Sequence, residues 1–148
     1  MISSVVSTKL LVIKYMFALS NKTDYAFLFL EYLSRHDNAV PLSKFVADQG
    51  IPRRFMAQIA SRLVRAQLVS SKEGISGGYT LKISPHKIPV YDVIRLFEGD
   101  LTVVKCNKKD FRCRYKIVCC HGDFFKDKLS KKLIKTLNGL TLKDVIAK

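Results

Sequence analysis

The sequence predicts a mainly α-helical winged helix-turn-helix with a small β-hairpin wing and a long C-terminal dimerisation helix. Three observations support this prediction: two short amphipathic helical patterns separated by Gly50, a glycine-rich hairpin pattern after them, and one late apolar helical stripe. A chain of 148 residues suits one compact domain with an appended element. We divide it into an N-terminal extension (1–15), a winged domain (16–99), a cysteine-containing sensor loop (100–122) and a C-terminal dimerisation segment (123–148).

The charge balance favours a polyanionic partner. The chain has 26 Lys and Arg against 12 Asp and Glu, a formal net charge of +14. Long-range attraction and counterion release then favour nucleic acid, followed by an anionic membrane surface. The alternative is a solvated lysine-rich surface. No run reaches the roughly 18 apolar residues of a membrane span, so we expect no membrane association and a cytoplasmic location.

The first fifteen residues are apolar but interrupted by Lys9 and Lys14. They lack the basic start and the small-residue cleavage site of a signal peptide. Because Met16 lies just before a helical pattern, residues 1–15 are interpreted as an extension that precedes the native start. Packing of this segment on the domain is the alternative.

The run Asn21–Leu33 is apolar on almost every side, which predicts a largely buried scaffold helix. Thr23 or Asn21 is expected to cap its start. A second, short helix follows Pro41, because Leu42 and two further apolar residues fall at helical spacing before the stop residue Gly50.

A third helix follows Pro52 after a tight turn, since Phe55, Ile59 and Leu63 recur every four residues. Its other face carries donors of the types that reach phosphates and base edges in a major groove: Arg53, Arg54, Gln58, Ser61, Arg62 and Arg65. The pair of helices therefore predicts a helix-turn-helix. Taken alone, it could equally be an ordinary helix pair with solvated arginines.

The next segment favours the helix-turn-helix over an ordinary helix pair. Strand-like runs at Leu68–Ser71 and Tyr79–Ser84 flank Gly74, Gly77 and Gly78, a pattern typical of a hairpin with a glycine-rich tip. Directly after a candidate recognition helix, such a hairpin is a wing that can approach a DNA backbone or minor groove. The combination favours DNA binding.

Two further helical patterns complete the chain. Val90, Val93, Ile94 and Phe97 predict a helix that Gly99 stops. A later helix, ended at 138–139, has one apolar stripe, formed by Phe125, Leu129, Leu133 and Leu137. A single stripe outside the winged core suits dimerisation, with packing back on its own domain as the alternative. The closing TLKDVIA suggests a last short helix.

All four cysteines lie in the loop between these helices, at Cys106, Cys113, Cys119 and Cys120. Their spacing lacks the paired CxxC of structural zinc sites and the tight CxxCxxC of small ferredoxins. The loop is basic, and nearby cations favour the thiolates that bind metal or react with oxidants: Lys105, Lys108, Lys109, Arg112, Arg114 and Lys116. Inert buried cysteines are the alternative.

The chain from about Leu19 to Ala147 resembles the Rrf2-type winged helix-turn-helix transcription regulators. The similarity rests on the order and spacing of KTDYAFLFLEYL, PLSKFVADQGIP, RLVRAQLVSSKEGISGGYTL, IPVYDVIRLFEG, the cysteine loop and TLKDV. The resemblance implies a homodimer on a partly palindromic double-stranded DNA operator, with the second short helix in the major groove and the wing in the minor groove. The residues that it assigns to DNA contact are Arg53, Arg54 and Gln58 on the helix, with Lys72, Ser76, Gly77 and Gly78 on the wing.

Cluster-binding members of this family hold a [2Fe-2S] or [4Fe-4S] cluster with three loop cysteines, which correspond here to Cys106, Cys113 and Cys119. In these members the cluster biases the dimer between two DNA affinities. Asp24 lies where one branch supplies an aspartate from the partner subunit, and it is our preferred fourth ligand. Cys120 and His121 are rival fourth ligands, and a carboxylate that only stabilises the helix start is the alternative role for Asp24.

Three departures from the family pattern limit what the resemblance implies. The first cysteine spacer has six residues where the family commonly has five, which weakens the cluster prediction. Gly122 occupies the place of a histidine ligand in one branch, so that fourth ligand is missing from its usual position. Glu73 stands where the family usually has arginine in the wing, which alters the expected minor-groove contact.

The leading hypothesis is therefore a DNA-binding transcription regulator that senses redox state, nitric oxide or iron-sulfur status through a loop cluster. A thiol-switch regulator of the same fold is the closest rival, supported by the vicinal Cys119 and Cys120. A zinc-stabilised DNA-binding or architectural protein is a second rival. An enzyme is not expected, since the sequence has no phosphate loop, no nucleophile with a plausible base and no HExxH motif, and its histidines are scattered: His36, His86 and His121.

Overall fold

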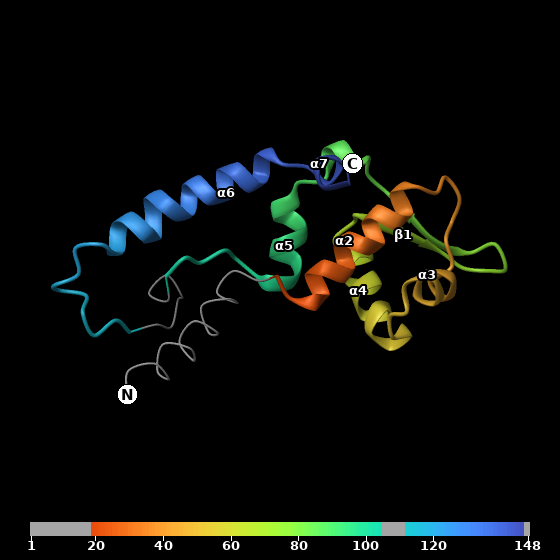
Figure 1. Cartoon of the computed structure of the whole chain (residues 1–148), viewed down its shortest axis with the longest axis horizontal. Helices are drawn as coiled ribbons and strands as arrows, with labels where there is room; N and C mark the ends of the chain where they lie inside the picture. Colours follow the sequence, from red (N-terminus) through yellow and green to blue (C-terminus); the bar gives the residue numbers. More distant parts are fainter. Residues whose placement is uncertain (1–18, 105–111, 147–148) are drawn as a thin grey trace, which may run out of the picture.

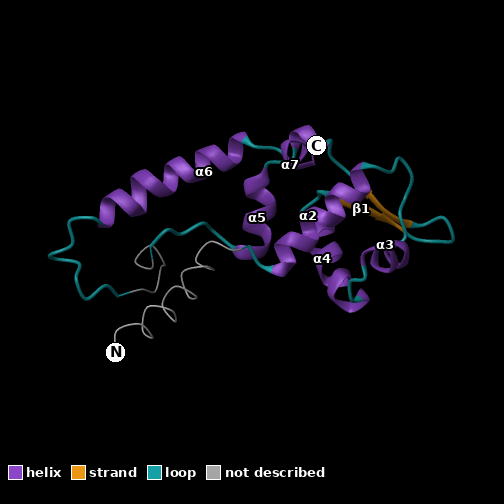
Figure 2. Ribbon diagram, viewed as in Figure 1, coloured by secondary structure: helices purple, strands orange, loops and turns teal. Residues whose placement is uncertain are grey.

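A computed structural model describes residues 19–104 and 112–146. It confirms the predicted winged helix-turn-helix: a mostly helical body carries one two-stranded antiparallel hairpin (Figure 1). The helices are α2 (Asn21–Ser34), α3 (Leu42–Gln49), α4 (Arg53–Arg65), α5 (Val90–Glu98), α6 (Ser130–Gly139) and α7 (Leu142–Ile146), and the strands are β1 (Val69–Lys72) and β2 (Gly78–Leu81). Figure 2 shows the hairpin at one end of the molecule and α6 reaching out at the other.

The scaffold helix α2 lies at the centre of the core, as its apolar sequence predicts. Ala26, Phe29 and Leu30 are fully buried. The ring of Phe29 lies 4.8 Å from that of Phe45 on α3 and 5.6 Å from that of Tyr79 on the hairpin. One side chain thus joins the scaffold, the helix-turn-helix and the wing, and sets where each stands relative to the others.

The turn between α3 and α4 depends on Gly50. Its φ of +64° is in the left-handed region, and its N–H donates to the carbonyl of Val46 to close α3. Glycine adopts this conformation without the cost that a Cβ imposes. After Pro52, α4 buries one face against the core, formed by Met56, Ile59, Ala60 and Leu63.

The wing is shorter on its second strand than predicted. β2 ends at Leu81 instead of Ser84: the N–H of Lys82 makes the last bond of the ladder, to the carbonyl of Leu68 at 3.0 Å, and the chain then enters a 3₁₀ turn (Pro85–Lys87). The hairpin is fixed to the body by two 2.9 Å hydrogen bonds between Val40 and Tyr79. A Cβ on Gly78 would come within 2.4 Å of the Val40 backbone, so only glycine allows this approach.

The predicted cap of α2 is wrong. Neither Asn21 nor Thr23 caps the helix, which begins after Ser20 without a side-chain cap of its own. The carboxylate of Glu98, at the end of α5, accepts the backbone N–H of Ser20 at 2.8 Å and the hydroxyl of Thr23. The start of α2 is therefore stabilised by a residue distant in sequence.

The C-terminal helix differs from the uninterrupted helix that the stripe predicts. Its first part, Phe124–Leu129, is a π-helical turn, and α6 begins only at Ser130. The buried hydroxyl of Ser130 donates to the carbonyl of Phe125 at 2.8 Å, a bond that fits the wider π turn. In the parts of the chain that the structure describes, no helix has the length and apolar character to cross a membrane.

After α6 the chain returns to the winged domain. The N–H of Leu142 donates to the carbonyl of Ile88 at 2.8 Å, and the N–H of Val90 donates to the carbonyl of Leu140 at 2.9 Å. Leu142 is fully buried. The short α7 thus anchors both the base of α6 and the start of α5 (Figure 1).

Candidate nucleic-acid interface and sensor loop

The outward face of α4 is basic. All six predicted donors of this helix are exposed: Arg53, Arg54, Gln58, Ser61, Arg62 and Arg65. The helix contains no acidic residue, and none of its arginines forms an ion pair among residues 19–104 and 112–146. Four guanidinium groups on one short helix thus have no internal counter-charge in the described structure, which makes this face a candidate site for an anionic ligand.

The positive charges in the first turn of α4 destabilise the start of this helix. Arg53 and Arg54 stand at the helix N-terminus, where the aligned peptide dipoles disfavour positive charge. A phosphate at this end would be stabilised by both the dipole and the arginines. The arrangement therefore suits a helix that meets a nucleic-acid backbone with its first turn.

Arg62 is placed differently from the other arginines. Its guanidinium carbon lies 5.9 Å from the ring centroid of Phe97 on α5, within cation–π range. Arg62 and Phe97 also line a small cleft with Lys22 and Gln58. Arg62 is thus the predicted DNA-contact residue that also links the recognition helix to α5.

The wing presents a closed turn at its tip. The N–H of Gly77 donates to the carbonyl of Gly74 at 2.9 Å, and a Cβ on Gly77 would lie 2.3 Å from the carbonyl oxygen of Lys72. Lys72 and Ser76 are exposed, as a DNA contact requires, whereas Gly77 and Gly78 are half-buried. The two glycines shape the tip, while the exposed residues are available to a ligand.

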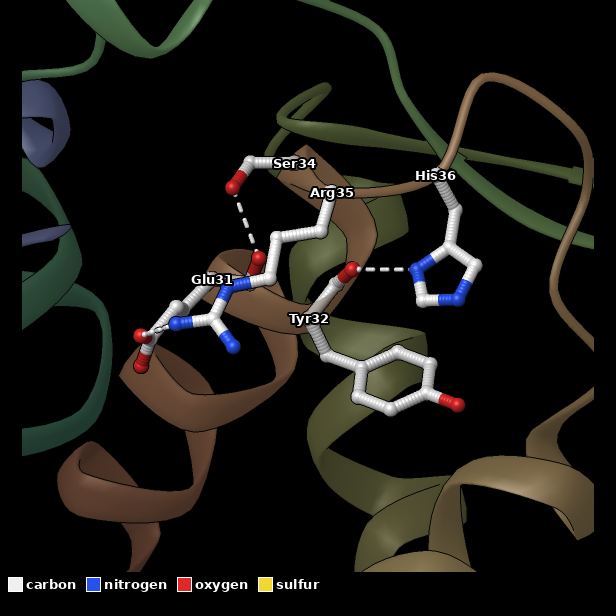
Figure 3. A network of polar contacts seen from close by, with 5 residues as sticks. All are labelled: Glu31, Tyr32, Ser34, Arg35 and His36. Atoms are coloured by element: carbon white, nitrogen blue, oxygen red, sulfur yellow. Dashed lines mark hydrogen bonds and ion pairs between the residues drawn. The ribbon is translucent and has the colours of Figure 1, made fainter.

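The polar contacts at the end of α2 are local except for one bond, which reaches α3. Arg35 pairs with Glu31, Ser34 donates to the carbonyl of Glu31, and His36 hydrogen-bonds through Nδ1 to the carbonyl of Tyr32 at 2.8 Å (Figure 3). The hydroxyl of Tyr32 donates to Asp48 on α3, and this bond raises the pKa of Tyr32. The sequence did not indicate this link, because its partners belong to different helices.

The network also accounts for His36. Its ring stacks on that of Tyr32, with centroids 4.5 Å apart and an interplanar angle of 18°. His36 is half-buried, and these two contacts with Tyr32 hold it at the end of α2.

The structure describes part of the predicted metal site. Cys106 lies outside the described residues. Cys113 and Cys119 are half-buried, and Cys120 and His121 are exposed. Asp24 is exposed in the first turn of α2. Within the described ranges, no three His, Cys, Asp or Glu side chains gather as metal ligands, so these residues alone do not assemble the site within one subunit.

The segment around the two half-buried thiols combines cations with exposed apolar side chains. Arg112, Arg114 and Lys116 are exposed, and Ile117 and Val118 are 99% and 76% exposed. This loop follows α5 directly and precedes the π-helical turn. It therefore lies between the winged domain and the C-terminal helix along the chain.

Comparison with known proteins identifies the family. Residues 19–148 match the Rrf2 family, described as "Iron-dependent Transcriptional regulator". The chain is 31% identical over 130 residues to the HTH-type transcriptional regulator IscR of Vibrio cholerae, a match that covers 86% of this chain and 74% of that protein.

Solved structures agree with this result. The structure of T. potens IscR is similar with a TM-score of 0.65 and 28% identity, over 90% of this chain and 88% of that one. CymR, the global cysteine regulator of B. subtilis, has the same fold, with a TM-score of 0.70, 24% identity, and coverage of 89% and 98%. The matched proteins are transcriptional regulators and not enzymes. The chain belongs to the Rrf2 family of DNA-binding transcriptional regulators.

Proposed function

We propose that this regulator acts as a homodimer that binds an operator through α4 and the wing, and that an iron-sulfur cluster in the cysteine loop controls its affinity. The observation that carries the DNA-contact assignment is the basic face of α4, whose arginines form no ion pair within residues 19–104 and 112–146, beside a wing with an exposed Lys72 and Ser76. Unpaired arginines can form bidentate bonds to guanine edges and phosphates without first breaking an internal ion pair.

Within this interface the residues divide by position. Arg53 and Arg54, in the first turn of α4, meet the DNA first, and Gln58 follows one turn later on the exposed face. Ser61 and Arg65 extend the same face toward phosphates. Glu73 in the wing adds a negative charge, so the wing contact depends on shape and hydrogen bonding more than on charge.

The cluster proposal rests on the confinement of all four cysteines to one loop. Cys106, Cys113 and Cys119 would hold the cluster, and Asp24 of a second subunit would supply the fourth ligand. When bound, such a cluster supplies an oxidation state and ligand exchange that respond to oxygen or nitric oxide. The chain's own contribution is to hold two of these thiols half-buried in a cationic loop that joins the winged domain to α6.

A thiol switch is the second candidate. The adjacent Cys119 and Cys120 differ in burial, the first half-buried and the second exposed, so oxidants reach Cys120 first. In this version a peroxide oxidises the Cys120 thiolate to a sulfenic acid and is itself reduced to water or an alcohol; a second loop thiol then attacks that sulfur, which forms the disulfide and releases water. The metal content of the purified protein distinguishes the two candidates.

The substitution Arg54→Ala tests the interface. We expect operator binding to weaken about tenfold or more, because one charge-assisted contact is lost, while the oligomeric state stays unchanged. The operator is obtained by selection from randomised duplexes, and affinity is measured by fluorescence anisotropy at fixed salt. Arg35→Ala is the matched control, since Arg35 is an exposed arginine paired to Glu31 on α2. Equal affinity of the wild type and Arg54→Ala would refute this orientation of α4.

A further inference from the structure

The last two residues of α5 contact two different helices of the DNA-binding body. The carboxylate of Glu98 accepts the N–H of Ser20 at 2.8 Å and the hydroxyl of Thr23, which is fully buried. Since α2 has no side-chain cap of its own, this carboxylate is the acceptor that holds the start of the scaffold helix.

The neighbouring residue contacts the recognition helix. Phe97 is half-buried against the core, and its ring lies under the guanidinium of Arg62 at 5.9 Å. Arg62 belongs to the exposed basic face of α4. The position of this arginine, and of the α4 turn that carries it, therefore depends on where the end of α5 stands.

The chain enters the cysteine loop directly after these two residues. Gly99 ends α5 with a φ of +83°, a conformation that glycine adopts readily, and Asp100 pairs with Arg95 at 2.7 Å on the exposed side. All four cysteines lie between residues 106 and 120. A displacement of the loop is thus transmitted first to Glu98 and Phe97.

We propose that Phe97 and Glu98 are positioning residues that couple the state of the cysteine loop to the placement of α2 and α4, and hence to DNA affinity. The inference rests on the proposed function but not on the identity of the group in the loop. Coupling requires that the loop state change the contacts of a bistable element. Two contacts from consecutive residues, the polar one of Glu98 and the aromatic one of Phe97, would carry such a change to α2 and α4, and each can be removed separately.

The test changes the loop by chemical modification of its cysteines and leaves the rest of the chain unmodified. Because every cysteine lies in the loop, alkylation with iodoacetamide modifies no other part of the chain, and mass spectrometry verifies that all four are modified. Operator affinity is measured before and after alkylation for the wild type, Thr23→Val and Phe97→Leu. Thr23→Val removes the hydroxyl donor at similar volume, and Phe97→Leu removes the ring under Arg62. Asp100→Asn is the matched control, since it alters the same region without touching α2 or α4.

We expect alkylation to change the wild-type affinity by about fivefold or more. In both variants this ratio, taken between the alkylated and unmodified forms of the same variant, falls toward one, while the unmodified proteins keep their helical content. Asp100→Asn keeps the wild-type ratio. A wild-type ratio retained by both variants, or no response of the wild type to alkylation, would overturn the coupling. Failure of the unmodified wild type to bind any selected duplex would refute the proposed function instead.

Discussion

Among the single residues, Glu98 stabilises the start of α2 from the end of α5, through bonds from the N–H of Ser20 and the hydroxyl of Thr23. Helix-capping rules look for an acceptor within a few positions of the helix start, and they point to Asn21 or Thr23. The acceptor used lies on α5, and Thr23 serves instead as a donor to it. The same limit applies to the bond between Tyr32 and Asp48. In contrast, the exposed donors of α4 were predictable, because a helical period alone assigns them to the face opposite the core.

The cap by Glu98 predicts a pH-dependent contribution to stability. Hydrogen bonds from Ser20 and Thr23 hold the pKa of Glu98 below its ordinary value of 4.5. A lowered pKa means that the stabilisation is fully present above pH 4.5 and is lost as the pH falls through the folded-state pKa. We expect Glu98→Gln to lower the free energy of unfolding by about 1 kcal/mol at neutral pH.

Urea denaturation from pH 3 to pH 8 measures this effect. The difference between the wild type and Glu98→Gln should be constant at neutral pH and shrink on the acid side, because both side chains are then uncharged. Asp100→Asn serves as the control carboxylate, since its exposed ion pair with Arg95 contributes little. A difference of the same size at pH 3 and pH 7 would contradict the assigned role of the charge.

At the scale of elements, the sequence predicted the four α-helices that the structure describes between residues 19 and 99, because apolar periodicity and glycine or proline stops mark them well. It missed two irregularities. The apolar stripe has a period near four residues, and this pattern does not distinguish an α-helical turn from the slightly wider π-helical turn at Phe124–Leu129. β2 ends early because the chain enters a 3₁₀ turn at Pro85–Lys87, and side-chain alternation does not mark where the strand gives way to that turn.

The packing of the wing on the body predicts that substitution of Gly78 destabilises the protein. Gly78→Ala should destabilise the protein by about 2 kcal/mol or more, because its φ of +151° and the Val40 backbone 2.4 Å from a Cβ both exclude a side chain. Thermal unfolding followed by circular dichroism measures the loss. The matched control is Gly139→Ala, where a Cβ meets nothing within 4 Å and no change or a small gain is expected. Equal melting temperatures for the wild type and Gly78→Ala would show that the wing is not fixed to the body in this way.

At the scale of the whole molecule, α6 reaches away from the winged domain (Figure 1), and an apolar groove lies beside it. The groove lies between α5 and α6, with Ile94, Leu101, Leu133 and Leu137 in its lining. The sequence predicted the stripe but left open whether it packs on its own domain or on a second copy. An open apolar groove in one chain supports the second choice, since exposed apolar surface of this kind usually marks an interface.

The proposed homodimer makes the effect of a charge in this groove testable. Leu137→Asp should convert the protein to a monomer and weaken operator binding, because a carboxylate would be buried without a partner in the interface. Multi-angle light scattering reports the mass. Lys135→Asp is the control, since Lys135 is exposed on the same helix and does not line the groove. A dimer of unchanged stability with Leu137→Asp would assign α6 to its own domain.

We propose that an iron-sulfur cluster in the cysteine loop controls DNA affinity, and the metal content of protein purified without oxygen is the first measurement to make. The measurement combines visible absorption with iron, sulfide and zinc analysis of the wild type and of Cys113→Ala. If the loop holds a cluster, we expect a coloured wild type that contains iron and sulfide, and a Cys113→Ala protein that has lost both but keeps its fold. A colourless wild type that contains no iron after attempted reconstitution would contradict the cluster and favour the thiol switch, or a zinc site if zinc were found.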